Sequence, residues 1–128
     1  MNVLLDSHIL IWALSDDDRL PPSARRILLD GEDAIYYSAA SIWELAVKHA
    51  LHPESVALTP SEFLSLCKKA GYIELPVYAS HARLLDSLTR SEGAPRHKDH
   101  FDRMLIAQAK SEGMAFLTHD NLLPYLTV

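Results

Sequence analysis

NVLLDSHILIWAL, residues 2–14, is the stretch of sequence that decides the fold. Its first half is a short apolar run that ends at Asp6, and such a run is typical of a strand buried in a parallel sheet. Ser7 can cap a helix, and apolar residues then recur at helical spacing over residues 9–13. A strand that leads directly into a helix begins a βαβ unit, so this segment predicts an α/β fold.

The rest of the chain repeats this alternation. Further strands are predicted over residues 34–37, 72–75 and 115–118, and helices over residues 22–30, 41–51, 60–70, 78–89 and 100–112. Helices between strands imply crossovers and a mostly parallel sheet that is covered on both faces. The prediction is therefore a three-layer α/β/α domain with a central parallel sheet of four to five strands, in which the order 3-2-1-4 would place the first and last of four strands side by side.

Length and composition predict one globular domain, residues 1–128, without a membrane span. The apolar runs are much shorter than the roughly 18 residues that a span needs, and the amino terminus does not resemble a secretory signal, so we expect a cytoplasmic protein. The single cysteine, Cys67, is expected to be a packed thiol. A net charge of −5 argues against a polyanionic partner, unless several acids gather in one pocket to hold cations.

Four acids are predicted to meet at one edge of the sheet. Asp6 ends the first strand, and Asp120 follows the last one. Glu44 and Asp102 are expected in the first turns of helices that run antiparallel to the strands, which places both at the same edge. Ligands of such folds bind beyond the carboxyl ends of the strands, where the strand order reverses.

A cluster of carboxylates favours a hard cation, Mg²⁺ or Mn²⁺. Such ions lower the pKa of bound water and stabilise the charge that develops during phosphodiester hydrolysis, and they would also relieve repulsion between the acids. Zinc is less favoured because His97, His100 and His119 have no cysteine partners, and substrate contact is the better interpretation of these histidines.

Each acid also has a purely structural interpretation. Glu44 fits a capping box that starts at Ser41 and an ion pair with Lys48, and these readings stay open. Asp6 and Asp120 fit turns that follow strands. The position of Asp102 favours a functional role, because helical spacing puts it on the same face as Ile106 and Ala109, toward the body of the protein.

Positive charge lies near the third acid. Arg96, Lys98 and Arg103 flank a polar loop, residues 91–98, which is expected to be mobile. They offer a binding surface for a phosphate backbone, or a solvated charge run. Both interpretations stay open.

With these residues in view, the chain resembles the PIN-domain family, and within it the VapC-like toxins, along essentially its whole length. The resemblance rests on LLDSH with Trp12 (residues 4–8 and 12), SIWELAVK (41–48), HKDHFDRMLIAQA (97–109) and LTHD (117–120). It implies that Asp6, Glu44, Asp102 and Asp120 are catalytic and bind Mg²⁺ or Mn²⁺, with Ser7 and Thr118 as supporting hydroxyls. His100 stands where proline is common and Ser7 where threonine is, and neither departure removes a ligand.

The resemblance also implies a function. Such proteins cleave RNA endonucleolytically, often transfer RNA, as the toxin of a toxin–antitoxin pair. A homodimer is implied, together with a cognate antitoxin in the active-site groove. The apolar helices over residues 9–14 and 63–66 suit that contact, and equally suit a core.

Three alternatives are weighed against this function. A phosphatase that uses Asp6 as nucleophile needs an acid two residues later, where His8 stands. A phosphoacceptor receiver domain needs an aspartate after a middle strand, where Ser38 stands. A non-catalytic RNA- or protein-binding module on the same fold is disfavoured because all four acids are present. Phosphate-loop enzymes are excluded, since the chain has four glycines and no glycine-rich turn.

Overall fold

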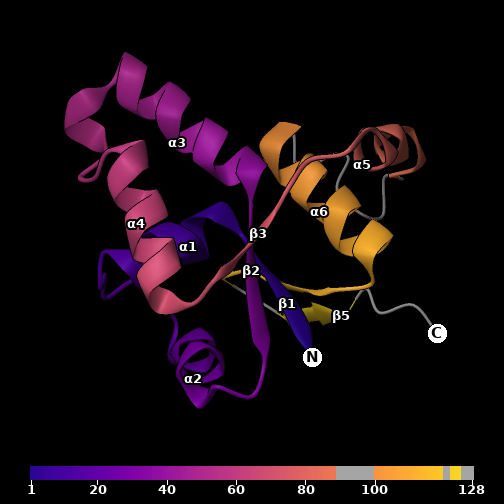
Figure 1. The fold of residues 1–128 in the computed structure, drawn as a ribbon, viewed down its shortest axis with the longest axis horizontal. Coiled ribbons are helices and arrows are strands. Elements are labelled where there is room, and N and C mark those ends of the chain that lie inside the picture. Colours follow the sequence, from indigo (N-terminus) through magenta and orange to yellow (C-terminus); the bar gives the residue numbers. More distant parts are fainter. Residues whose placement is uncertain (89–99, 120–121, 125–128) are drawn as a thin grey trace.

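A five-stranded sheet forms the centre of the protein, with the strand order β3-β2-β1-β4-β5 (Figure 1). The computed structural model describes residues 1–88, 100–119 and 122–124. The strands are β1 (Asn2–Leu5), β2 (Ala34–Ser38), β3 (Ile73–Leu75), β4 (Ala115–Leu117) and β5 (Leu122–Pro124). The first four are parallel, and β5 pairs with β4 in the antiparallel sense. The predicted order of the four parallel strands is confirmed.

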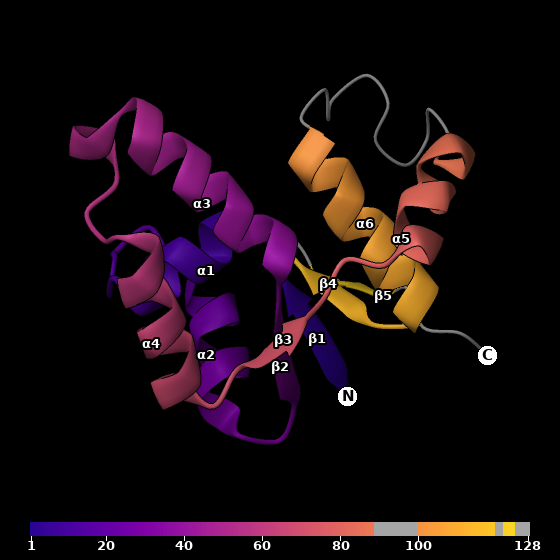
Figure 2. The same cartoon turned by 45° about the horizontal axis from the view of Figure 1, so that its top comes forward.

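Helices cover both faces of the sheet (Figures 1 and 2). On one face lie α1 (Ser7–Leu14), α2 (Pro22–Asp30) and α4 (Pro60–Ala70), and on the other lie α5 (Ala79–Arg83) and α6 (His100–Glu112). Helix α3 (Ala39–Leu51) continues from β2 and is followed by the 3₁₀ turn η1 (Pro53–Ser55), while η2 (Leu84–Ser87) follows α5. The predicted three-layer α/β/α fold is confirmed.

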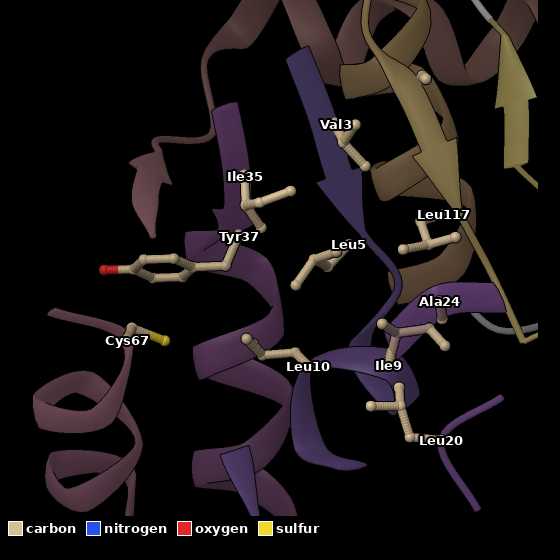
Figure 3. Close-up of a cluster of buried hydrophobic side chains, with 11 residues drawn as sticks. Val3, Leu5, Ile9, Leu10, Leu20, Ala24, Ile35, Tyr37, Cys67 and Leu117 are labelled. Carbon is tan, nitrogen blue, oxygen red and sulfur yellow. The ribbon is translucent and has the colours of Figure 1, made fainter. Parts of the chain in front are cut away.

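Strand β1 divides the core in two. Val3 and Leu5 pack into the cluster on the α1 and α2 side, which Figure 3 shows together with Ile9 and Cys67. Leu4 points the other way, into the cluster that α6 completes. Because successive side chains of a strand point to opposite faces, a run of three fully buried residues needs cover on both sides.

Two predicted helix starts are wrong. Asp6, and not Ser7, caps α1, since its carboxylate accepts a hydrogen bond from the His8 N–H group. Helix α3 begins at Ala39 with Ser38 as its cap, so Ser41 lies inside the helix and forms no capping box. Glu44 therefore lies in the second turn of α3, and not in the first. Ser38 reaches this role because β2 runs one residue further than predicted and leads into α3 without a loop.

Other local predictions agree with the structure. Thr59 and Glu62 form the capping box of α4, and Gly31 and Gly71 end α2 and α4 with φ of 76° and 79°. The helix predicted over residues 78–89 is shorter, because α5 gives way to η2. The loop predicted over residues 91–98 and the cap predicted at Asp99 lie outside the described residues. In the described part of the chain, every helix is too short or too polar to cross a membrane.

Gln108 joins α6 to the functional edge of the sheet. Its fully buried amide accepts a hydrogen bond from the Ser38 hydroxyl and donates one to the Pro76 carbonyl at 3.2 Å. The Ser38 hydroxyl also accepts from the Ala40 N–H group at 3.0 Å. One side chain thus connects α6, the start of α3 and the exit from β3.

Gln108→Leu is expected to lower the free energy of unfolding by about 1–3 kcal/mol, because it leaves buried polar groups without their partner. Urea denaturation measures the change. Ser111→Ala, on the exposed side of the same helix, is the control and should change stability little. Equal stability of the Leu variant and the parent chain would contradict this role of Gln108.

Candidate active site

Asp6 stands where β1 meets α1. Its backbone N–H group donates to the Leu117 carbonyl at 2.9 Å, which extends the β1–β4 pairing by one residue. Its carboxylate accepts from the His8 N–H group at 3.2 Å, and the side chain is buried, with 8% of the residue exposed. The sheet and the helix together leave this carboxylate little freedom.

Glu44 presents a second buried carboxylate from α3, with 4% of the residue exposed. One oxygen, Oε2, forms an ion pair with Lys48 Nζ at 2.9 Å. The other, Oε1, is buried and has no hydrogen-bond partner. A buried oxygen without a partner costs free energy, and charged groups cost most, so this atom marks a place for a ligand or an ordered water.

The two carboxylates interact electrostatically. Burial raises the pKa of Asp6 above its usual value, and the charge of Glu44 acts in the same direction. The hydrogen bond from the His8 N–H group and the electrostatic influence of His8 and His119 oppose this rise in the pKa of Asp6. The pair therefore holds negative charge at a cost that a cation would relieve.

A buried hydrogen bond joins the two segments that carry these acids. The hydroxyls of Ser7 and Ser41 lie 2.8 Å apart, and both residues are buried. Each serine neighbours its acid, Ser7 in sequence and Ser41 one helical turn before Glu44. The bond thus ties α1 to α3 at the acid pair. The spacing of Ser41 and Glu44 was the available signal, and sequence analysis assigned it to a cap.

Asp102 lies in the first turn of α6 and is half-buried. The residues that precede Asp102 and Glu44 are in contact, because the rings of Phe101 and Trp43 meet edge to face with centroids 5.1 Å apart. The amino-terminal end of α6 therefore lies beside the first half of α3. Leu105, Ile106 and Ala109 are buried, as the helical spacing predicted.

The other predicted site residues divide into two groups. Thr118 directly follows β4 and is half-buried, at the edge where Asp6 lies. Arg103 donates from Nη2 to the Leu85 carbonyl at 3.1 Å, which directs its guanidinium toward η2. Asp120, Arg96 and Lys98 lie outside the described residues, as does His97.

An apolar pocket lies between the first half of α3 and the amino-terminal part of α6. It has a volume of about 680 Å³, and its lining includes Trp43, Val77, Phe101 and Met104. Trp43 is 65% exposed, so a large apolar side chain faces solvent at the rim of this pocket. By contrast, Ile9, Leu10 and Phe63, in the two helices considered for partner contact, are buried in the core.

The chemistry of the acids fits a hard divalent cation. Asp6 and Glu44 offer carboxylate oxygens, which Mg²⁺ and Mn²⁺ prefer, and Glu44 Oε1 has a coordination position to give. Within residues 1–88, 100–119 and 122–124, no three His, Cys, Asp or Glu side chains gather closely enough to hold a metal ion. The described part of the predicted four-acid cluster is thus the pair of Asp6 and Glu44, and Asp102 lies in the first turn of the neighbouring helix α6.

The comparisons agree with this architecture. The PIN domain family matches residues 3–126, and the chain belongs to this family. No curated protein sequence matches the chain. Among solved structures, it is similar to a chain of the crystal structure of VapBC2 from Rickettsia felis bound to a DNA fragment from their promoter. The TM-score is 0.64, the sequences are 18% identical, and the match covers 98% of this chain and 96% of the other, so this likeness concerns the fold.

Asp6→Asn is expected to stabilise the protein at neutral pH when divalent cations are removed. The pKa of Asp6 is higher in the folded state than in the unfolded state. Protonated Asp6 therefore contributes fully to the free energy of unfolding below the unfolded-state pKa, and this contribution is lost as the pH rises through the folded-state pKa. Asparagine removes the buried charge and can still cap α1. Chemical denaturation in EDTA at pH 7 should give a higher free energy of unfolding for Asp6→Asn than for the parent chain, and this difference should shrink toward pH 4. A variant less stable than the parent at pH 7 would refute the idea of a strained carboxylate.

Proposed function

We propose that this protein is a magnesium- or manganese-dependent endoribonuclease and the toxin of a toxin–antitoxin pair. The observation that carries the proposal is the buried Asp6–Glu44 pair at the carboxyl edge of the sheet, with Glu44 Oε1 lacking a partner. Membership of the PIN domain family supports nuclease chemistry at this edge.

Asp6 and Glu44 would hold the cation together with Asp102 and Asp120. Bound there, the ion supplies an activated water and stabilises charge on the phosphate. The buried surroundings of Asp6 and Glu44 restrict the movement of both carboxylates, and their low dielectric would strengthen the interaction with a cation. The Ser7–Ser41 hydrogen bond would keep the spacing of the two acids, and Thr118 is proposed as a supporting hydroxyl. Arg96, Lys98 and Arg103 are proposed to contact the RNA backbone.

A protein partner is proposed for the apolar pocket beside Trp43. A contiguous apolar surface on a monomer marks an interaction site. The structurally similar chain comes from the crystal structure of VapBC2 from Rickettsia felis bound to a DNA fragment from their promoter, which supports a cognate antitoxin for this chain. We propose that a second copy of the chain and the antitoxin are the partners that bury this surface.

Purified protein should cut RNA only when Mg²⁺ or Mn²⁺ is present, and Asp6→Asn or Asp102→Asn should reduce cutting by at least about a hundredfold, because a metal ligand is lost. Mapping of RNA ends measures the cut. The ion should also raise the melting temperature of the parent chain more than that of Asp6→Asn. Asp30→Asn, an exposed aspartate at the end of α2, is the matched control. Full cleavage by Asp6→Asn would rule out the proposed chemistry.

Expression of the chain alone should arrest growth of a bacterial host, and coexpression of the adjacent open reading frame should relieve the arrest. Asp6→Asn expressed alone should be harmless, because toxicity requires the cut. Growth curves and sequencing of new RNA ends give both readouts. If the parent chain cuts RNA in vitro but leaves growth unaffected at matched protein levels, the toxin assignment fails and the nuclease assignment remains.

A further inference from the structure

A second cavity, of about 410 Å³, lies between α1 and the carboxyl-terminal half of α3. Its lining includes four basic or imidazole side chains, an indole and a hydroxyl: His8, Trp12, Arg19, Lys48, His52 and Ser55. No carboxylate is among the described residues that line it. In a chain with a net charge of −5, a cavity that is lined by Arg19, Lys48 and two imidazoles needs an explanation.

The cavity adjoins the acid pair through two of its residues. His8 follows Asp6 by two positions, and Lys48 follows Glu44 by one helical turn, with its ammonium on Glu44 Oε2 at 2.9 Å. The four residues from Glu44 to Lys48 rise about 6 Å along the helix, whereas successive nucleotides of a stacked strand rise about 3.4 Å each. A strand cut beside Asp6 and Glu44 would thus place a phosphate one or two nucleotides away in this cavity.

Arg19 is held in place for such a contact. Its Nη2 and Nε atoms bond to the Asp17 carboxylate at 2.7 and 3.1 Å, and its guanidinium lies 5.5 Å from the centroid of the Trp12 ring. These hydrogen bonds lower the pKa of Asp17 to about 2. Nη1 takes no part in the pair with Asp17, so its two donors can face a ligand without breaking it.

The Trp12 ring lines the cavity and contacts several of the other groups around it. The His8 ring lies against it at 5.6 Å and the His119 ring meets its edge at 6.4 Å, while Arg19 takes a further position around it. Trp12 therefore links the cationic groups to the end of β4, from which His119 comes. An occupant of the cavity should change the environment of this indole.

We infer that this cavity binds a backbone phosphate of single-stranded RNA next to the scissile linkage, with Arg19 and Lys48 as its cationic ligands. The inference rests on the proposed function and names a subsite of the same substrate. Lys48 has three donors, so one ammonium can bridge Glu44 and the phosphate. Neither ligand requires rearrangement of the core, because their side chains are 71% and 47% exposed.

The test measures binding of a short 2′-O-methyl oligoribonucleotide, which cannot be cleaved through its 2′ position, in EDTA at several salt concentrations. Arg19→Gln and Lys48→Gln should each weaken binding about tenfold and reduce the slope of log affinity against log salt by about 0.7. Arg26→Gln, an exposed arginine on α2, removes the same charge elsewhere and should change affinity less than about twofold. With Trp43→Phe, Trp12 is the sole tryptophan, and its fluorescence should respond to the oligonucleotide.

Equal weakening in all three charge variants, or no binding by the parent chain, would overturn the inference. It would also be overturned if Arg19→Gln kept its RNA affinity but lost binding of an acidic protein partner. The two proposals fail separately. RNA cleavage with unchanged binding in the cavity variants removes only the subsite, whereas cavity-dependent binding without metal-dependent cleavage removes only the nuclease.

Discussion

Two buried carboxylates of like charge, Asp6 and Glu44, are the constraint on which the rest of this structure depends. Burial raises the pKa of Asp6, and Glu44 Oε1 has no hydrogen-bond partner, so each group carries a local free-energy cost beside the contacts that it makes. Contacts that do not involve the carboxylates also fix the two residues in place. The Asp6 N–H group extends the β1–β4 pairing, and the Ser7 and Ser41 hydroxyls join the two segments. Packing of the sheet core on both faces of β1 supplies the free energy that offsets this local cost.

The sequence predicts what depends on local pattern. Short apolar runs identified the strands, and Gly31 and Gly71 identified helix ends, because only glycine adopts positive φ without strain. Two helix starts were misassigned because several hydroxyl and acid residues stand close together in sequence, and each can cap. At α3 the choice between Ser38 and Ser41 is made far away, by Gln108, which holds the Ser38 hydroxyl, and by Ser7, which holds that of Ser41. Periodicity carries no signal for such partners, which are 70 and 34 positions away.

The charge of the chain is arranged in neighbouring patches of opposite sign. Asp6 and Glu44 lie at the sheet edge, and the cavity beside them is lined by Arg19, Lys48 and two histidines. The net charge alone argued against a polyanionic partner. That argument assumes that the charge is spread evenly over the surface of the protein. At an ionic strength of about 0.1 M, charges are screened over about 10 Å, so a strand of RNA responds to the groups within that range, together with any cation that the acids hold, and not to the total charge. A net charge of −5 is therefore compatible with phosphate binding at one place on the surface.

The two interpretations of Glu44, helix ion pair and functional acid, describe the same arrangement. Lys48 reaches the buried oxygen Oε2 from a side chain that is 47% exposed, while Oε1 stays without a partner. A half-exposed ion pair contributes little stability, since solvent competes for the ammonium and ordering its long side chain costs entropy. Because the pair is weak, a dication can share or replace it at small cost, and the released donors of Lys48 already line the neighbouring cavity. A fully buried pair at this position would be costly to break, because removing one partner leaves a buried charge uncompensated, and a dication could not replace it easily.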